Sequence, residues 1–166
     1  MGRMLRLLVL LLAAAFAWGA WTAHHPGASP PLPRGPAARH PGVAVPNPRL
    51  TPGATVAGVT TRRLCRQGGA APAAVPAALR RQVLASYGIP AGRARAYRID
   101  HLIPVELGGA ATVANLWPQP PAGAAAKDRL ERWLRRQTCS GRLSLAAAQR
   151  RIAGDWYQAW VAAGRP

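Results

Sequence analysis

The chain has 166 residues, of which 22 are Lys or Arg and only 5 are Asp or Glu, so its formal net charge is +17. This length fits one domain of about 100–150 residues and excludes a large multidomain enzyme, a coiled coil and a long solenoid. The charge excludes an acidic disordered protein and indicates an anionic partner, such as nucleic acid, anionic lipid or an acidic polymer. GC-rich coding sequence also favours Arg and Ala, so the charge alone identifies no function.

Residues 1–20 have the order of a secretion signal. Arg3 and Arg6 form a basic start, an apolar run covers residues 7–16, and small residues follow. We therefore expect export to the periplasm or the cell exterior, with cleavage near residues 19–23. The apolar run is shorter than the roughly 20 residues of a spanning helix, and an uncleaved membrane anchor is the alternative.

Residues 21–60 are predicted to form an extended, mobile linker. Nine prolines are interspersed with Gly, Ala and Ser, and the segment has no acidic residue. Such a composition buries too little apolar surface to offset the entropy lost on ordering. His24, His25 and His40 lie in this segment, and we interpret the adjacent pair His24–His25 as incidental rather than as metal ligands. The folded domain is expected to span residues 61–166.

The first elements of that domain are a helix and two short strands. The helix is expected to begin at Pro76 and to end before Gly88, with four apolar side chains on one face: Leu79, Val83, Leu84 and Tyr87. Short strands are predicted at 97–100 and 115–117, separated by a loop rich in Pro and Gly.

Two longer helices complete the predicted domain. The first covers about residues 124–138, with an apolar face of Leu130, Trp133 and Leu134. The last helix begins after Ser144 as its N-cap and places five apolar residues at helical spacing, namely Leu145, Ala148, Ile152, Trp156 and Trp160. We interpret these tryptophans as core residues rather than as platforms for stacked bases.

The two cysteines are Cys65 and Cys139, and the chain has no Cys-x-x-Cys pair, which argues against a zinc knuckle or ribbon. In an exported protein they most simply form one disulfide. The bond would close a separation of 74 residues and contribute about 4 kcal/mol as an upper guide. Two free buried thiols are the alternative.

The acidic residues are concentrated near one histidine. Four of the five lie between Asp100 and Glu131, and the same window contains His101 and the only lysine, Lys127. Carboxylates in a basic protein either pair with arginine or serve metal and acid–base chemistry. We assign Glu131 and Asp155 to the first role, each with an arginine nearby on its helix.

Asp100 and His101 stand at the end of a predicted strand, and Asn115 begins the next one. A hairpin followed by a helix would bring these residues together. Phosphodiester hydrolysis uses such parts, because a cation held by oxygen ligands polarises the phosphate and a neutral imidazole deprotonates water. The structural alternative is that Asp100 and Asn115 cap loops and that His101 is buried and paired. Between them, Glu106 is expected to order the loop and the glycines at 108–109 to form a tight turn.

Two runs of the sequence, YRIDHLIPVELGG at 97–109 and NLWPQ at 115–119, resemble the HNH endonucleases of the ββα-metal (His-Me finger) group. More narrowly, the chain is similar to small exported bacterial HNH-like proteins over roughly residues 60–160, both cysteines included. The resemblance implies an α+β fold with a small ββα-metal hairpin-plus-helix core and additional flanking helices.

The resemblance also implies roles for individual residues. His101 matches the general base, Asp100 matches the carboxylate that ligates the metal, and Asn115 matches the Asn that either ligates the metal or fixes the His loop. The family's helix His or Asn is missing from residues 120–131, so either Asp128 or water would complete the site. The implied metal is Mg²⁺ or Mn²⁺ rather than Zn²⁺.

Basic residues are expected to hold the substrate. Arg95, Arg98 and Lys127 are candidates for phosphate contacts, although Lys127 is equally interpretable as a lysine on the helix surface. Residues 62–98 contain eight arginines and no acid, which predicts binding with little sequence preference that weakens with salt.

We therefore expect an exported, metal-dependent endonuclease that cleaves DNA in preference to RNA with little sequence specificity. The alternative is a catalytically inactive module of the same fold that binds nucleic acid or another polyanion. The missing helix His favours this alternative. We expect a monomer, with a stable membrane partner only if residues 1–20 are retained.

Overall fold

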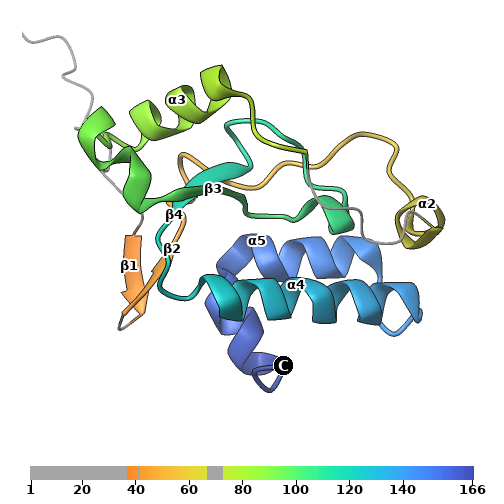
Figure 1. Cartoon of the computed structure of the whole chain (residues 1–166). Helices are drawn as coiled ribbons and strands as arrows, with labels where there is room; N and C mark the ends of the chain where they lie inside the picture. Colours follow the sequence, from red (N-terminus) through yellow and green to blue (C-terminus); the bar gives the residue numbers. More distant parts are fainter. Residues whose placement is uncertain (1–36, 41, 67–72) are drawn as a thin grey trace, which may run out of the picture. The chain divides into compact units, whose positions relative to one another are not determined.

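The computed structural model describes residues 37–40, 42–66 and 73–166. The predicted signal segment and residues 21–36 lie outside this part of the chain. The described part has two two-stranded antiparallel sheets together with α-helices and short 3-10 helices (Figure 1). The fold is therefore a mixture of helix and strand, as predicted. Within these residues, no helix has the length and apolar character needed to cross a membrane.

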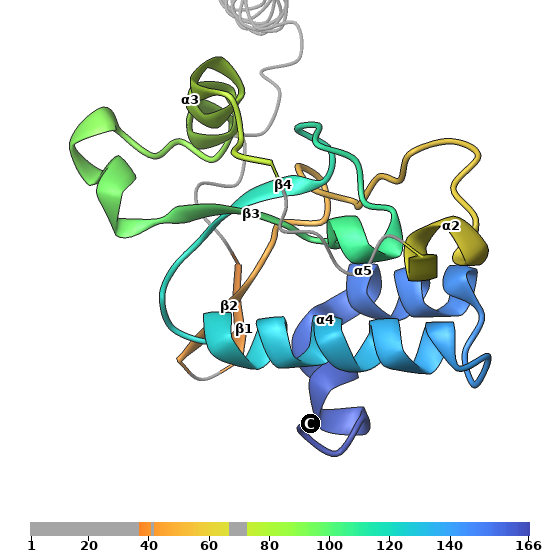
Figure 2. The ribbon, with the colours of Figure 1, turned by 45° about the vertical axis from the view of Figure 1, so that its right-hand side comes forward.

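The residues of the predicted site lie in a β-hairpin and the helix that follows it. Strand β3 (Arg98–His101) pairs antiparallel with β4 (Leu116–Gln119), and helix α4 (Ala124–Cys139) follows after a short connection (Figure 2). In this register His101 lies opposite Leu116. The two predicted strands and the predicted helix are confirmed to within two residues at each end.

Strand β4 continues through Pro118, where the sequence predicted its end. The Leu102 N–H donates to the Asn115 carbonyl oxygen at 2.7 Å. Because bonded and non-bonded pairs alternate in an antiparallel ladder, Ile99 and Pro118 form a non-hydrogen-bonded pair. The missing N–H of Pro118 is therefore not needed by the ladder, and the strand continues to Gln119.

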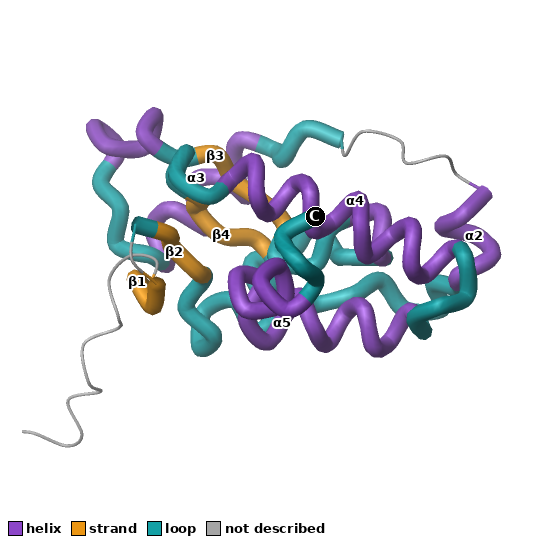
Figure 3. The backbone as a smooth tube through the Cα atoms, turned by 90° about the horizontal axis from the view of Figure 1, so that it is seen from below, coloured by secondary structure: helices purple, strands orange, loops and turns teal. Residues whose placement is uncertain are grey.

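The hydrophobic core joins the hairpin to α4 and to helix α5 (Leu145–Ala162), and the two helices lie side by side (Figures 1 and 3). Trp117 and Trp156 are fully buried, which confirms for α5 that a tryptophan serves the core. The Ser144 hydroxyl oxygen accepts the Ala147 N–H at 3.2 Å, so the predicted N-cap is also confirmed.

Helix α5 is interrupted at Asp155, although the sequence predicted one continuous helix. Asp155 has an extended backbone, and its Oδ1 accepts the N–H groups of Tyr157 and Gln158, each at 3.0 Å. Its carboxylate therefore caps the second half of the helix. The Asp155 Oδ2 also lies 3.0 Å from Nε2 of His40. The predicted pairing of Asp155 with an arginine is wrong, because its partner is His40.

Residues 42–60 differ from the predicted mobile linker. Strands β1 (Ala37–His40) and β2 (Val43–Val45) form a hairpin, and the last residue of β2 is 3 % exposed in the core. Further along, the Thr51 hydroxyl lies 2.7 Å from the Tyr87 hydroxyl. The rest of the domain thus supplies the contacts that the segment's own composition lacks, and the folded part begins earlier than predicted.

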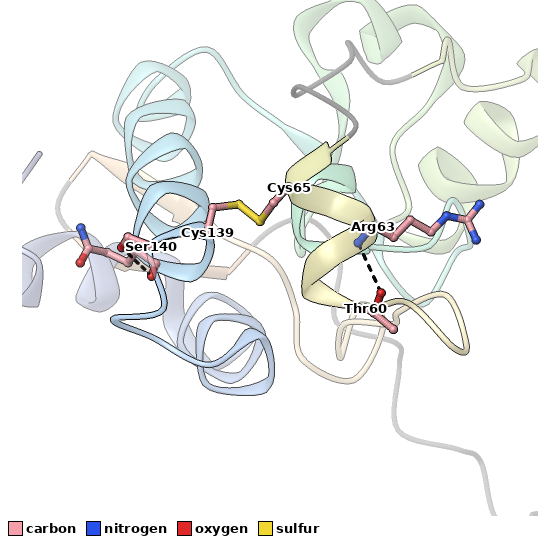
Figure 4. Close-up of a disulfide and its surroundings, with 6 residues drawn as sticks. Thr60, Arg63, Cys65, Cys139 and Ser140 are labelled. Atoms are coloured by element: carbon pink, nitrogen blue, oxygen red, sulfur yellow. Dashed lines mark hydrogen bonds between the residues drawn. A yellow bond between two sulfur atoms is a disulfide. The ribbon is translucent and has the colours of Figure 1, made fainter.

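Helix α2 (Thr61–Arg66), which no sequence pattern predicted, is tied to the end of α4 by a disulfide (Figure 4). The bond joins Cys65 and Cys139, whose Cα atoms are 5.6 Å apart, and it confirms the predicted pairing. At the start of α2, the Thr60 hydroxyl oxygen accepts the Arg63 N–H at 3.3 Å. This six-residue helix is therefore fixed at both ends.

Helix α3 (Ala77–Ser86) begins after Pro76, as predicted, and packs against β4. The 3-10 helix η1 (Ala91–Ala96) connects α3 to β3. The Arg80 guanidinium donates to the carbonyl oxygens of Ala94 and Tyr97 at 2.9 and 3.1 Å. This arginine of α3 therefore holds the connection in place.

Candidate active site

Asn115 holds the loop that follows His101. Its Oδ1 accepts the Ile103 N–H at 2.9 Å, and its Nδ2 donates to the carbonyl oxygens of Ile103 and Ala110 at 2.9 and 3.0 Å. The side chain is fully buried. Both ends of the amide are used by backbone groups, so Asn115 holds the His loop in the way that one of its two predicted roles requires.

Gly109 lets the backbone pass directly against this loop. A Cβ atom at Gly109 would lie 1.7 Å from the Ile103 carbonyl oxygen and 2.9 Å from Nδ2 of Asn115. Its neighbour Gly108 has φ of 78° and ends the 3-10 helix η2 (Val105–Leu107). The predicted tight turn is confirmed at Gly108, whereas position 109 needs glycine because of the close approach.

Lys127, in the first turn of α4, is fully buried. Its ammonium group donates to the His101 carbonyl oxygen at 2.6 Å, lies 2.7 Å from Oδ2 of Asp100, and pairs with the Glu131 carboxylate one turn along the helix. Neither interpretation from the sequence is right, because the ammonium is enclosed by the protein and faces neither solvent nor a substrate phosphate. The predicted arginine partner of Glu131 is likewise replaced by this lysine.

The charges around Lys127 are unbalanced. Burial opposes the charged form of the ammonium, but Glu131 and Asp100 outweigh burial and raise the pKa of Lys127. Burial also raises the pKa of Glu131 to about 7, against the opposing attraction of Lys127. One ammonium thus faces two carboxylates, and Glu131 relieves the excess negative charge by taking up a proton near neutral pH.

Arg98 covers the outer side of the same carboxylates. Its Nε donates to Oε1 of Gln119 at 2.7 Å, and its Nη2 lies 2.6 Å from Oδ1 of Asp128 and 3.4 Å from Oδ1 of Asp100. Asp128, a predicted metal ligand, is therefore paired with an arginine. Arg98 itself is 45 % exposed and stays accessible from outside.

His101 is 7 % exposed at the end of β3. Its Nε2 is buried and has no hydrogen-bond partner among the residues that the structure describes. Seven other buried side-chain atoms in this part of the chain share this property, among them Nε1 of the core residues Trp117 and Trp156, so the unpaired nitrogen leaves His101 available as an acceptor but gives it no role by itself. Burial lowers the pKa of His101, against the opposing charge of Asp100. The ring is therefore neutral at pH 7 and can accept a proton.

A cavity of about 640 Å³ opens over these groups. Its charged and ionisable lining comes from β3, η2 and one face of α4, and consists of Arg98, Asp100, His101, Glu106, Asp128, Glu131, Arg132 and Arg135. Arg132 and Arg135 were not among the predicted site residues, although their spacing from Asp128 and Glu131 places all four on one helical face. The predicted phosphate ligand Arg95 is exposed on η1 and does not line this cavity.

No protein-family model matches the chain, and comparisons with curated proteins and with solved structures also found no match.

The three predicted ligands do not form the expected divalent-metal site. Of the three predicted ligands, Asn115 is bonded to backbone, Asp128 is paired with Arg98, and Asp100 is shared between Arg98 and Lys127. Within residues 37–40, 42–66 and 73–166, no three His, Cys, Asp or Glu side chains lie close enough together to hold a metal ion. What the cavity does offer is a neutral imidazole beside arginines.

Proposed function

We propose that this protein is an exported hydrolase of phosphodiester bonds in nucleic acid, with its active site at the cavity over β3 and α4. The observation that carries the proposal is His101, a buried neutral imidazole with an unpaired nitrogen at a charged cavity. His101 is also the residue that matches the general base in the resemblance to HNH endonucleases. We further propose that β3, β4 and α4 form the ββα core of that group.

The reaction begins when the His101 imidazole accepts a proton from a water molecule. The water oxygen attacks phosphorus, and the bond from phosphorus to the leaving sugar oxygen breaks in line with the attack. That oxygen takes a proton from the imidazolium or from solvent, so one phosphodiester and one water give a phosphate monoester and an alcohol. Arg132 and Arg135 line the cavity, and neither is ion-paired within the described residues, so they can stabilise the phosphate charge.

Nucleic acid is the substrate that the charge favours. A chain with formal charge +17 binds phosphate backbones through counterion release, with little dependence on base sequence. We propose DNA ahead of RNA as the substrate. We infer export from the signal-like order of residues in segment 1–20. The disulfide supports it, because disulfides persist in oxidising compartments.

One observation favours a second candidate, a polyanion-binding module without turnover. The three side chains predicted to bind metal are all engaged by protein groups. In that case the arginines would hold nucleic acid, but no bond would be cleaved.

A plasmid assay distinguishes the two candidates. Purified protein is incubated with supercoiled plasmid, with and without Mg²⁺ or Mn²⁺, beside His101→Ala and the control His40→Gln. The control removes a histidine that pairs with Asp155 away from the cavity. Nicking that disappears in His101→Ala and persists in His40→Gln supports the hydrolase. Binding without nicking under every condition supports the module, and equal nicking by His101→Ala rejects His101 as the base.

A further inference from the structure

The ammonium group of Lys127 is surrounded by three oxygens inside the domain. They are the His101 carbonyl oxygen at 2.6 Å, Oδ2 of Asp100 at 2.7 Å and a carboxylate oxygen of Glu131. Two of these oxygens, on the His101 carbonyl and the Glu131 carboxylate, accept hydrogen bonds from the ammonium, whereas Oδ2 of Asp100 is ion-paired with it but accepts no hydrogen bond within the described residues. Fully buried lysines are rare unless paired, and this one is 0 % exposed.

The same oxygens are those that a divalent cation would use. Mg²⁺ and Mn²⁺ prefer carboxylate and carbonyl oxygens, and Asp100, Glu131 and the His101 carbonyl group provide both kinds around one point. A positive charge already lies among them. A divalent ion could enter only by displacing the Lys127 side chain from its enclosed position.

The remaining carboxylates at the cavity do not offer a second place. Asp128 lies 2.6 Å from Nη2 of Arg98, and Oδ1 of Asp100 lies 3.4 Å from the same nitrogen. Within the described residues, Glu106 is left as the one lining carboxylate without an ion pair. One carboxylate alone is a weak ligand set for a resident metal.

We propose that Lys127 is a built-in cation that takes the place of a resident divalent metal, and that the cavity therefore acts on phosphodiesters without one. The second half of this inference rests on the proposed function; the first half does not. Lys127 is a positioning residue, because it does not line the cavity and instead orients the Asp100 carboxylate and the His101 backbone. Arg98, Arg132 and Arg135 supply the positive charge that faces the phosphate.

Mn²⁺ binding monitored by electron paramagnetic resonance tests, without an activity assay, whether Lys127 takes the place of a metal. Wild-type protein, Lys127→Ala, the double variant Lys127→Ala/Glu131→Gln and the control Arg132→Ala are titrated with Mn²⁺. The control removes a cation that lines the cavity but does not contact these oxygens.

We expect no stoichiometric Mn²⁺ binding by wild-type protein or by Arg132→Ala. Lys127→Ala frees the two carboxylates and should bind one Mn²⁺ roughly tenfold more tightly than wild type or better, and the double variant should lose that gain. One Mn²⁺ bound stoichiometrically by wild-type protein and lost in Asp100→Asn overturns the inference.

Lys127→Ala leaves buried carboxylates unpaired, which can unfold a domain, so circular dichroism accompanies the titration. If the variant does not fold, wild-type protein decides through its Mn²⁺ titration and through plasmid nicking in EDTA. Nicking that continues in EDTA supports the built-in cation, whereas nicking that requires added metal overturns it and leaves the hydrolase intact. No nicking under any condition rejects the hydrolase, and the Mn²⁺ titration still decides the role of Lys127.

Discussion

Two buried polar side chains fix the backbone at His101 and just after it. Lys127 donates to the His101 carbonyl oxygen, and Asn115 bonds to both the N–H and the carbonyl oxygen of Ile103. Backbone held at both points leaves the imidazole little freedom to move away from the cavity. The position of the proposed base is therefore set by protein groups alone, and its surroundings keep it neutral at pH 7.

Asn115→Asp tests whether Asn115 fixes the loop or ligates a metal. The substitution keeps one acceptor for the Ile103 N–H but turns a carboxylate oxygen toward the carbonyls of Ile103 and Ala110, which now lack a donor. We expect a loss of about 3 kcal/mol in the free energy of unfolding, measured with urea. A variant as stable as wild type that also binds Mn²⁺ more tightly would contradict the loop-fixing role.

Glu131→Gln tests the charge imbalance around Lys127. The pKa of Glu131 is about 7 in the folded chain and ordinarily 4.5, so the folded state holds more protons than the unfolded state between these values. The contribution of Glu131 to stability therefore falls as pH rises from about 4.5 to 7 and is constant above that.

The free energies of unfolding of wild type and Glu131→Gln, measured across this range, should diverge in favour of the variant as pH rises. The lowered pKa of His101 has the opposite effect, because it makes stability rise with pH just below 6.5. His101 is present in both proteins, so its effect cancels in the difference between their free energies of unfolding. A difference that does not change with pH would refute a raised pKa for Glu131.

The hairpin and the helix after it were predictable because each has a strong local pattern. Alternation of apolar and polar residues at 97–100 predicts a strand that matches β3, and helical spacing at 124–138 predicts a helix that matches α4. Local patterns do not reveal which partner a charge finds across the fold. For that reason the buried triad of Lys127, Asp100 and Glu131 escaped prediction, although the lysine and Glu131 stand four residues apart on one helix.

The loop between β3 and β4 depends on glycine at one point of contact. In Gly109→Ala the added methyl group would overlap the Ile103 carbonyl oxygen, so the loop and the Asn115 bonds must shift. We expect a loss of about 2–4 kcal/mol in unfolding free energy, together with loss of any hydrolytic activity.

Gly92→Ala is the matched control for this substitution, because a Cβ at Gly92 meets no atom within 4 Å. Its stability should stay within about 0.5 kcal/mol of wild type in the same urea titration. If Gly109→Ala behaves like Gly92→Ala, the close approach at the loop does not restrict the chain as described.

The domain as a whole reaches further toward the N-terminus than composition indicates. A segment rich in Pro and Gly reads as a linker when judged alone, but Val45 and Thr51 are buried by the residues that follow. His40 likewise has its side-chain partner, Asp155, 115 residues away in the sequence. Such contacts depend on the completed fold, which is why the domain boundary could not be placed from the sequence.

The disulfide links the two distant parts of the domain, α2 and the end of α4. Closing a separation of 74 residues should stabilise the fold by up to about 4 kcal/mol by restricting the unfolded chain. Reductant should therefore lower the urea midpoint of wild-type protein toward that of Cys65→Ser/Cys139→Ser, and it should not change the midpoint of the variant. Equal midpoints for oxidised and reduced wild type would contradict a stabilising bond.

The proposed hydrolysis depends most on His101 as a neutral general base. The most direct measurement is the single-turnover rate of hydrolysis of a short DNA duplex from pH 5 to 8, for wild type and His101→Gln. The wild-type rate should rise with pH through a midpoint below the ordinary 6.5 and then level off, because burial lowers the pKa of His101. His101→Gln should be slower by about 10²–10⁴-fold and show no such rise. Hydrolysis by His101→Gln at the wild-type rate, with the same pH profile, would contradict the account.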